Sequence, residues 1–185
     1  MATTRLYTIE DLEALPDDGH VYDLVDGELR RREPVGVEHG IIGGELSGRL
    51  WAFVHEHGLG AVLISDTIYV YRRDPDRSLK PDISFIRADR LPVGADLPRP
   101  SSIPPDLAVE VVSPNDPAEE VDERIALYRS FGVPLVWVLW PRRKAVTVYA
   151  DGRLVRELLE GDELDGGDVL PGFRVAVADL FRIGR

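Results

Sequence analysis

The segment from residue 107 to residue 140 constrains the fold more than any other part of this sequence. An apolar run at 107–112 is interrupted by one acid, and a second apolar run covers 135–140. Between them, Asp116, Pro117 and Glu119 predict a helix start, with an N-cap, a proline at the first helical position and a capping-box acid. Two buried strands joined by such a helix form a crossover connection, which predicts at least one parallel strand pair.

Shorter periodic segments flank this strand–helix–strand unit. On its N-terminal side the patterns predict a helix at 9–15, a hairpin at 21–32, a long helix at 37–57 and strands at 61–71 and 81–86. A charged turn is predicted at 72–79 and a proline-rich loop at 88–105. On its C-terminal side we expect a hairpin at 145–159, a strand near 173–175 and a helical turn at 177–181. This order predicts a single domain over residues 1–185, of the α+β (mixed α/β) class, built on a central mixed sheet.

Composition and charge narrow the functional classes. The chain has no cysteine, which excludes disulfide scaffolds, thiolate zinc sites and cysteine nucleophiles. Its 22 basic and 33 acidic residues give a net charge of −11, which argues against nucleic-acid binding through bulk charge. An enzyme that bridges phosphates through metal ions is still compatible with this charge. No apolar run reaches the ~20 residues that span a bilayer, and residues 1–6 lack the apolar core of a signal peptide, so we expect a cytoplasmic protein.

Two acids interrupt segments that are otherwise apolar, and they are the strongest candidates for a chemical role. Asp82 lies in KPDISF at 80–85 and Glu110 in AVEVV at 108–112. A buried carboxylate is unfavourable unless it is paired, protonated or bound to a cation. Two carboxylates on neighbouring strands, about 5 Å apart, would repel each other, and a divalent metal ion resolves that conflict. Strand alternation would put Lys80 on the same face as Asp82.

A structural interpretation of the same acids is also open. Glu110 would then be buried against an Arg or Lys, and Asp82 would cap the end of a strand. Arg30, Arg31 and Arg32 are interpreted as charges that keep an edge strand soluble, with phosphate contacts as the alternative.

Four short motifs in register resemble the Uma2 family of the PD-(D/E)xK nuclease-like superfamily. They are YDLVDGE at 22–28, KPD at 80–82, PDLAVEVVSP at 105–114, and Tyr128 followed by GVP at 132–134. The resemblance covers nearly the whole chain in the right order. It implies a restriction-endonuclease-like core, in which a central mixed sheet is flanked by helices and carries the acid pair at one end.

The resemblance also implies a metal-assisted hydrolysis of phosphodiester bonds. Asp82, Glu110 and the backbone carbonyl of Val111 would hold Mg²⁺ or Mn²⁺, which would polarise the scissile phosphate and lower the pKa of a bound water. The superfamily pattern has a Lys two residues after the second acid, and this chain has Val112 there.

Two cations are candidates to replace that lysine. The family's basic residue on the following helix, four positions before the tyrosine, corresponds to Arg124, while Lys80 could act from the Asp82 strand. Either side chain could stabilise the developing phosphate charge, but a guanidinium with a pKa above about 12 cannot act as a general base. Arg124 could instead pair with Glu120 on the same helix.

Accessory roles are considered for His39 and Glu45, which belong to the predicted helix at 37–57. The resemblance often includes a His in this region, and superfamily members sometimes add an acid from the first core helix. The alternatives are a surface histidine and a solvated acidic residue.

Three functions remain open from the sequence. The first is a metal-dependent endonuclease with DNA as substrate. The second is a catalytically impaired nuclease-fold protein that binds nucleic acid or protein, and the third is a hydrolase of a smaller phosphate compound. A homodimer is expected, because cleaving both strands of a duplex suits a pair of sites and the apolar hairpin after Trp140 needs cover. Cleavage specificity and the choice between DNA and RNA do not follow from the sequence.

Overall fold

A six-stranded mixed sheet forms the centre of the computed structural model, which describes residues 5–64, 67–92, 101–151 and 153–184. The strand order is β10-β9-β8-β7-β6-β3, in which β7 and β8 are parallel and the other neighbours are antiparallel. This mixed sheet with its helices confirms the predicted α+β class. The six strands are β3 (Gly60–Ile64), β6 (Ile83–Arg87), β7 (Leu107–Val111), β8 (Leu135–Trp140), β9 (Ala145–Ala150) and β10 (Arg153–Leu158).

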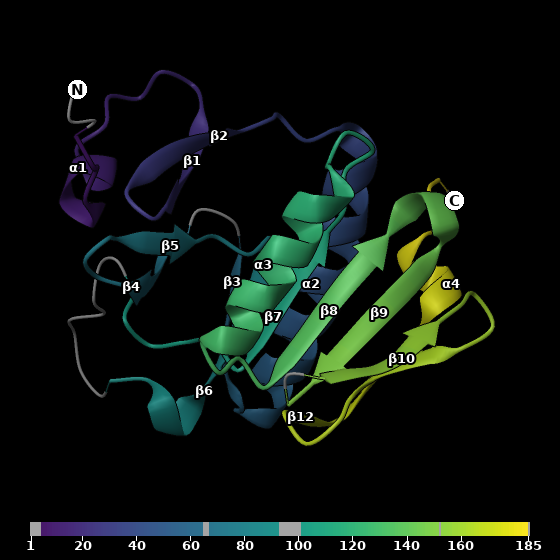
Figure 1. Cartoon of the computed structure of the whole chain (residues 1–185). Helices are drawn as coiled ribbons and strands as arrows, with labels where there is room; N and C mark the ends of the chain where they lie inside the picture. Colours follow the sequence, from purple (N-terminus) through teal and green to yellow (C-terminus); the bar gives the residue numbers. More distant parts are fainter. Residues whose placement is uncertain (1–4, 65–66, 93–100, 152, 185) are drawn as a thin grey trace.

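The parallel pair comes from the predicted strand–helix–strand unit. Helix α3 (Ala118–Ser130) connects β7 to β8, and Leu107 lies opposite Leu135 in the ladder. Every residue of β7 is buried, because helices cover both faces of the sheet. Figure 1 shows α3 in front of the sheet and α2 (Val37–His57) behind it. The carboxyl ends of β7 and β8 therefore meet at one edge of the sheet, the upper edge in Figure 1.

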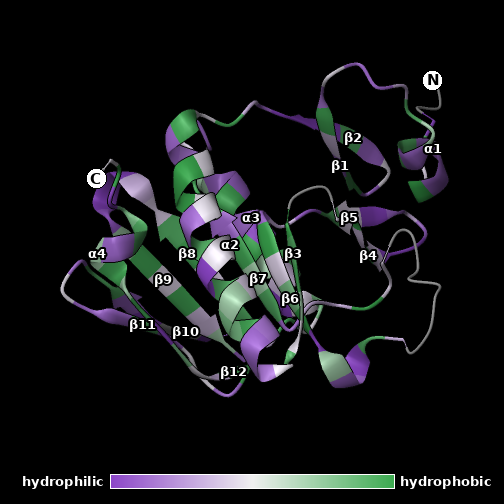
Figure 2. Ribbon diagram, turned by 180° about the vertical axis from the view of Figure 1, so that it is seen from behind, coloured by the Kyte–Doolittle hydropathy of each residue, from purple (hydrophilic) through white to green (hydrophobic). Residues whose placement is uncertain are grey.

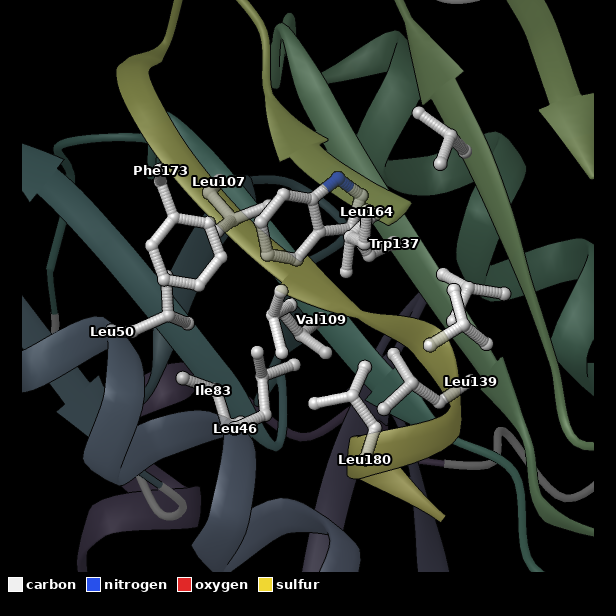
Figure 3. Close-up of a cluster of buried hydrophobic side chains, with 14 of the residues drawn as sticks. Leu46, Leu50, Ile83, Leu107, Val109, Trp137, Leu139, Leu164, Phe173 and Leu180 are labelled. Atoms are coloured by element: carbon white, nitrogen blue, oxygen red, sulfur yellow. The ribbon is translucent and has the colours of Figure 1, made fainter. Parts of the chain in front are cut away.

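The larger part of the core lies on the α2 side of the sheet. The inner face of α2 carries four buried aliphatic side chains at a spacing of four residues, as the sequence predicts. Figure 3 shows two of them, Leu46 and Leu50, with side chains of the central strands and with Leu164, Phe173 and Leu180. Burying each such side chain contributes about 1.5–3 kcal/mol. Leu164, Phe173 and Leu180 belong, in that order, to β11 (Glu163–Gly166), β12 (Leu170–Ala176) and α4 (Val177–Leu180).

A second cluster fills the space between α3 and the opposite face of the sheet. It includes Val121, Ile125 and Tyr128 of α3 with Val112 and Val136. Figure 2 shows hydrophobic residues gathered on the strands that the helices cover, and mainly hydrophilic residues along β2 (Glu28–Arg32). No helix in the described part of the chain is long and apolar enough to cross a membrane.

The N-terminal segment and the hairpin that follows β3 together form a small layer beside the sheet. It contains α1 (Ile9–Glu13), the hairpin of β1 (Val21–Val25) with β2, and the hairpin of β4 (Tyr69–Arg72) with β5 (Arg77–Leu79). Asp26 and Gly27 adopt φ values of 52° and 80°, the left-handed pair that a tight two-residue hairpin needs, as predicted. A side-chain contact of 2.7 Å between Arg30 and Glu123 ties β2 to α3.

Several local predictions are wrong. The main reason is that one continuous apolar pattern covers two strands that pair in different sheets. The strand expected at 61–71 is two strands, β3 in the central sheet and β4 in the separate hairpin, with residues 65–66 outside the described residues. The turn expected at 72–79 ends in β5. The loop expected at 88–105 begins with the 3-10 turn Ala88–Arg90, and its residues 93–100 are likewise outside the described part. Ser101 pairs with Tyr69.

Candidate functional site

The two acids singled out by the sequence lie at the same end of neighbouring strands. Glu110 belongs to β7 and is 1 % exposed. Asp82 directly precedes β6, because this strand begins at Ile83, two residues later than the strand predicted at 81–86. The Asp82 amide donates to the Val109 carbonyl at 3.1 Å, and its carboxylate accepts from the Val111 amide at 2.8 Å. The side chain of Asp82 thus takes the place of a backbone acceptor where the β6–β7 ladder ends.

Three side chains surround the carboxylate of Glu110. The Tyr128 hydroxyl donates to Oε1. The Nε of Arg124 lies 3.2 Å from Oε2, and Nη2 of Arg32 lies 3.5 Å from the same atom. Tyr128 and Arg124 project from α3, one helical turn apart, onto the face of β7 that carries Glu110. The structure therefore brings together Glu110 and the predicted Arg124, and adds a cation from the N-terminal hairpin.

The position of Arg124 depends on Asp116 rather than on Glu120. Arg124 Nη2 contacts Asp116 Oδ2 at 3.2 Å. Arg124 therefore pairs with Asp116 and Glu110, which both lie outside the helix, instead of with Glu120. Asp116 also differs from its predicted role, because the N-cap is Pro117 and has no side-chain cap. The Asp116 carboxylate instead accepts from the Ser113 amide at 3.1 Å and shapes the loop between β7 and α3.

Sequence reasoning missed Arg32 and Asp23. The sequence pattern favours a charge that keeps an edge strand soluble, with phosphate contacts as the alternative, yet the side chain of Arg32 is only 24 % exposed and contacts Asp23 and Glu110. Its Nε lies 3.3 Å from Asp23 Oδ2, and its Nη1 donates to the Lys80 carbonyl at 2.9 Å. Asp23 belongs to the YDLVDGE motif. An acid directly beside apolar Leu24 in a hairpin strand was the available sign that Asp23 has a special role. The local sequence does not show, however, which part of the protein the hairpin packs against.

His39 joins the site from the first turns of α2. Its Nε2 lies 3.1 Å from Asp82 Oδ2, within hydrogen-bonding distance. Burial alone would lower the pKa of His39, but the hydrogen bond to Asp82 and the negative charges of Asp82 and Glu110 outweigh burial and raise it. The predicted accessory histidine therefore contacts the first of the two acids.

Glu45 stands apart from this cluster, whereas Lys80 lies at its margin, beside Arg32 and Asp23. Glu45 pairs with Arg49 at 2.7 Å on the outer part of α2, which agrees with the solvated alternative. Lys80 lies close enough to Asp23 for its charge to lower the pKa of that carboxyl. Among the described residues that line the cavity, neither Glu45 nor Lys80 appears. Val112, at the position of the superfamily lysine, packs with the apolar residues of α3.

Burial and mutual repulsion control the charges of the acids. Burial, reinforced by the charge of Asp82, raises the pKa of Glu110 to about 7, although Arg124 and Arg32 oppose the change. Burial would raise the pKa of Asp82 too, but the hydrogen bond with His39, its charge and the Val111 amide lower it overall. Burial also raises the pKa of Asp23. The surroundings of Asp82 thus favour its ionised form, whereas those of Glu110 favour its protonated form.

The cluster opens into a cavity of about 960 Å³. Its walls come from the hairpin β1–β2, the segment that joins β2 to α2, the ends of β6 and β7, and the loop that precedes α3. The charged side chains of the site that line it are Asp23, Arg32, His39, Asp82, Glu110, Asp116 and Arg124.

A mixed sheet between two helices, with paired carboxylates at one strand end and cations beside them, defines a nuclease-like protein of the restriction-endonuclease type. The model of the Uma2 family, described as "Putative restriction endonuclease", matches residues 9–178. The chain therefore belongs to the Uma2 family, as its motifs predict. Families of this type generally use divalent metal ions.

A solved structure shares the fold over almost its whole length. The chain is similar to the crystal structure of "a putative nuclease belonging to DUF820" from Anabaena variabilis, with a TM-score of 0.82 and 19 % sequence identity. The match covers 94 % of this chain and 97 % of that chain. At this identity the likeness establishes the fold, and it confirms the nuclease-like core. Among curated proteins, none matches the chain.

Proposed function

We propose that this protein is a metal-dependent endonuclease that hydrolyses DNA phosphodiester bonds in the cavity beside Asp82 and Glu110. The observation that carries the proposal is the placement of buried Glu110 and partly buried Asp82 at the same end of neighbouring strands, in the wall of a cavity that guanidinium groups also line. Such a pair is costly to a fold unless a cation compensates it. Membership of a family described as restriction endonucleases supports the same reaction class.

The chemistry of the donor groups fits Mg²⁺ or Mn²⁺. Carboxylate and carbonyl oxygens are the ligands these ions prefer. Burial and the charge of Asp82 raise the pKa of Glu110, and a divalent cation would stabilise its ionised form against both. Asp82, Glu110 and the carbonyl of Val111 would hold the ion, which supplies a water of lowered pKa and polarises the phosphate. Within the described residues no group of three or more His, Asp or Glu side chains is arranged to hold a metal ion. Water and substrate oxygens would therefore complete the ligand set.

The side chains around the acids have distinct roles in this reaction. Arg124, fixed by Asp116, would bind a non-bridging oxygen of the phosphate and stabilise the charge that develops there. Its guanidinium stays protonated, so it holds charge and does not move a proton. His39 orients the Asp82 carboxylate through Nε2, and its raised pKa keeps the ring charged over a wider pH range.

The proposal is tested by metal binding and DNA cleavage in the same set of variants. Isothermal titration with Mn²⁺ and Mg²⁺, followed by nicking of supercoiled plasmid, would compare the wild type with Asp82→Ala/Glu110→Ala. Asp106→Asn is the matched control, because Asp106 is a buried acid at the opposite end of β7. We expect binding and cleavage in the wild type and the control, and neither in the double variant. Metal affinity that survives the double substitution would refute the assignment of these ligands.

A catalytically impaired nuclease-fold protein that binds nucleic acid or protein is the second candidate. It is favoured by the contacts of Glu110, because Oε1 accepts from Tyr128 and Oε2 faces two arginines. The net charge of −11 points the same way for a duplex ligand. Retained DNA binding without metal binding or cleavage would support this candidate. Hydrolysis of bis(p-nitrophenyl) phosphate without plasmid nicking would support a small phosphate substrate.

The proposed homodimer is a separate prediction. Sedimentation equilibrium with and without a short DNA duplex measures it directly, and a monomer in both conditions would refute it.

A further inference from the structure

Arg32 occupies a central position among the acids of the site. Its guanidinium contacts Asp23 through Nε at 3.3 Å and Glu110 through Nη2 at 3.5 Å, and it also feels the charge of Asp82. The third nitrogen, Nη1, donates to the Lys80 carbonyl. One planar cation thus connects the N-terminal hairpin with the ends of both acid-bearing strands.

The hairpin that carries Arg32 contacts α3 through a second arginine. Arg30, two residues earlier on the same face of β2, pairs with Glu123 of α3 at 2.7 Å. Asp23 lies opposite Arg30 in the β1–β2 ladder, is 7 % exposed and has one buried oxygen, Oδ1, without a hydrogen-bond partner. A buried carboxylate in this state depends strongly on its remaining cationic partner.

We propose that Arg32 is the built-in counter-ion of the acid cluster, and that it competes with a divalent cation for Glu110 and so sets the metal affinity of the site. The inference rests on the proposed function for its metal-binding part. Arg32 neutralises part of the charge of Asp23 and Glu110, which keeps the acid pair compatible with the folded state. The same positive charge repels a second cation close by, since like charges a few ångströms apart interact strongly in a partly buried site.

The expected consequence is opposite to that of losing a metal ligand. Removing a ligand weakens binding, whereas removing a competing charge strengthens it. Arg32→Met should bind Mn²⁺ at least tenfold more tightly than the wild type, while Arg32→Lys, which keeps the charge, should stay within about threefold. Arg32 is a positioning residue in this scheme, because it acts on the metal through Glu110.

The experiment is titration calorimetry with Mn²⁺ alone on the folded variants, with Arg90→Met as the matched control. Arg90 forms a comparable pair with buried Asp106 at 2.7 Å, at the other end of the sheet, so its loss should leave Mn²⁺ affinity unchanged. Unchanged or weaker Mn²⁺ binding in folded Arg32→Met would overturn the proposal. Tighter binding in Arg90→Met as well would also overturn it, because the effect would then reflect net charge.

A second measurement separates failure of the counter-ion from failure of the proposed function. A double-mutant cycle at pH 7 with Arg32→Met, Asp23→Asn and both changes reports their coupling through urea unfolding without any metal. We expect a coupling of at least tenfold in the unfolding equilibrium constant. If the wild type binds no Mn²⁺, the proposed function fails, and the double-mutant cycle alone then tests whether Arg32 is the counter-ion of the acids.

A coupling below twofold would refute the role of Arg32 as counter-ion. Should Arg32→Met not fold, restored folding in the double variant supports the counter-ion, and an unfolded double variant refutes it.

Discussion

Replacing Glu110 by Gln tests whether ionisation of this carboxyl destabilises the folded protein. Burial and the charge of Asp82 raise its pKa to about 7, against a value of 4.5 for an unperturbed glutamate. Between these two pH values the folded protein keeps a proton that the unfolded chain has released. The free energy of unfolding must therefore fall as the pH rises, since stability decreases wherever the folded state binds more protons.

The magnitude follows from the two pKa values. At about 1.4 kcal/mol for each pKa unit, the shift from 4.5 to about 7 corresponds to about 3 kcal/mol. The favourable contribution of Glu110 is complete below pH 4.5 and is lost as the pH rises through about 7. The amide in Glu110→Gln has nearly the shape of the protonated acid and does not ionise. The wild type should therefore lose about 3 kcal/mol of stability relative to the variant between pH 4.5 and pH 8.

Urea unfolding followed by tryptophan fluorescence measures this difference, because Trp137 is fully buried in the core. The series runs in half-unit steps from pH 4.5 to pH 8, with Glu45→Gln on the outer part of α2 as the control. A surface substitution of this kind should stay within about 0.5 kcal/mol of the wild type. A pH-independent difference for Glu110→Gln would refute the reasoning. A difference of the opposite sign would show that Arg124 and Arg32 outweigh burial at this carboxyl.

Four further predictions concern other parts of the molecule. Tyr128→Phe should cost about 1–3 kcal/mol of unfolding free energy, because it removes the hydroxyl donor of buried Glu110, and urea unfolding at pH 8 measures this. Trp137→Ala should cost about 3–5 kcal/mol in urea unfolding followed by circular dichroism, since the side chain is 0 % exposed. Gly60→Ala should unfold well below the wild-type melting temperature, because a Cβ would lie 2.0 Å from the Ile86 carbonyl oxygen; circular dichroism records it. Arg124→Lys should lower kcat for plasmid nicking at least about tenfold, because lysine lacks the planar guanidinium that can contact Asp116 and the phosphate together. An unchanged kcat would show that Arg124 has no role in the reaction.

Local sequence patterns determined much of the architecture. Two apolar runs joined by a helical segment specified the parallel pair β7–β8, because a helix that covers a sheet requires both neighbouring strands to be apolar. The helix at 37–57 and the hairpin around Asp26-Gly27 followed from periodicity and turn chemistry in the same way. The acids that interrupt the apolar runs identified Asp82 and Glu110, and the structure places both at one sheet edge.

Tertiary structure alone decided the rest of the site. Periodicity says which face of an element is covered, but not which distant element covers it. The sequence therefore favours a solubilising role for Arg32 and assigns none to Asp23, although the docking of their hairpin places both side chains beside the acid cluster. In the same way the helix pattern offers Glu120 as a partner for Arg124, whereas the folded chain brings Glu110 and Asp116 to it. Charge pairs of this kind depend on contacts between residues far apart in the sequence, and so only the folded chain determines them.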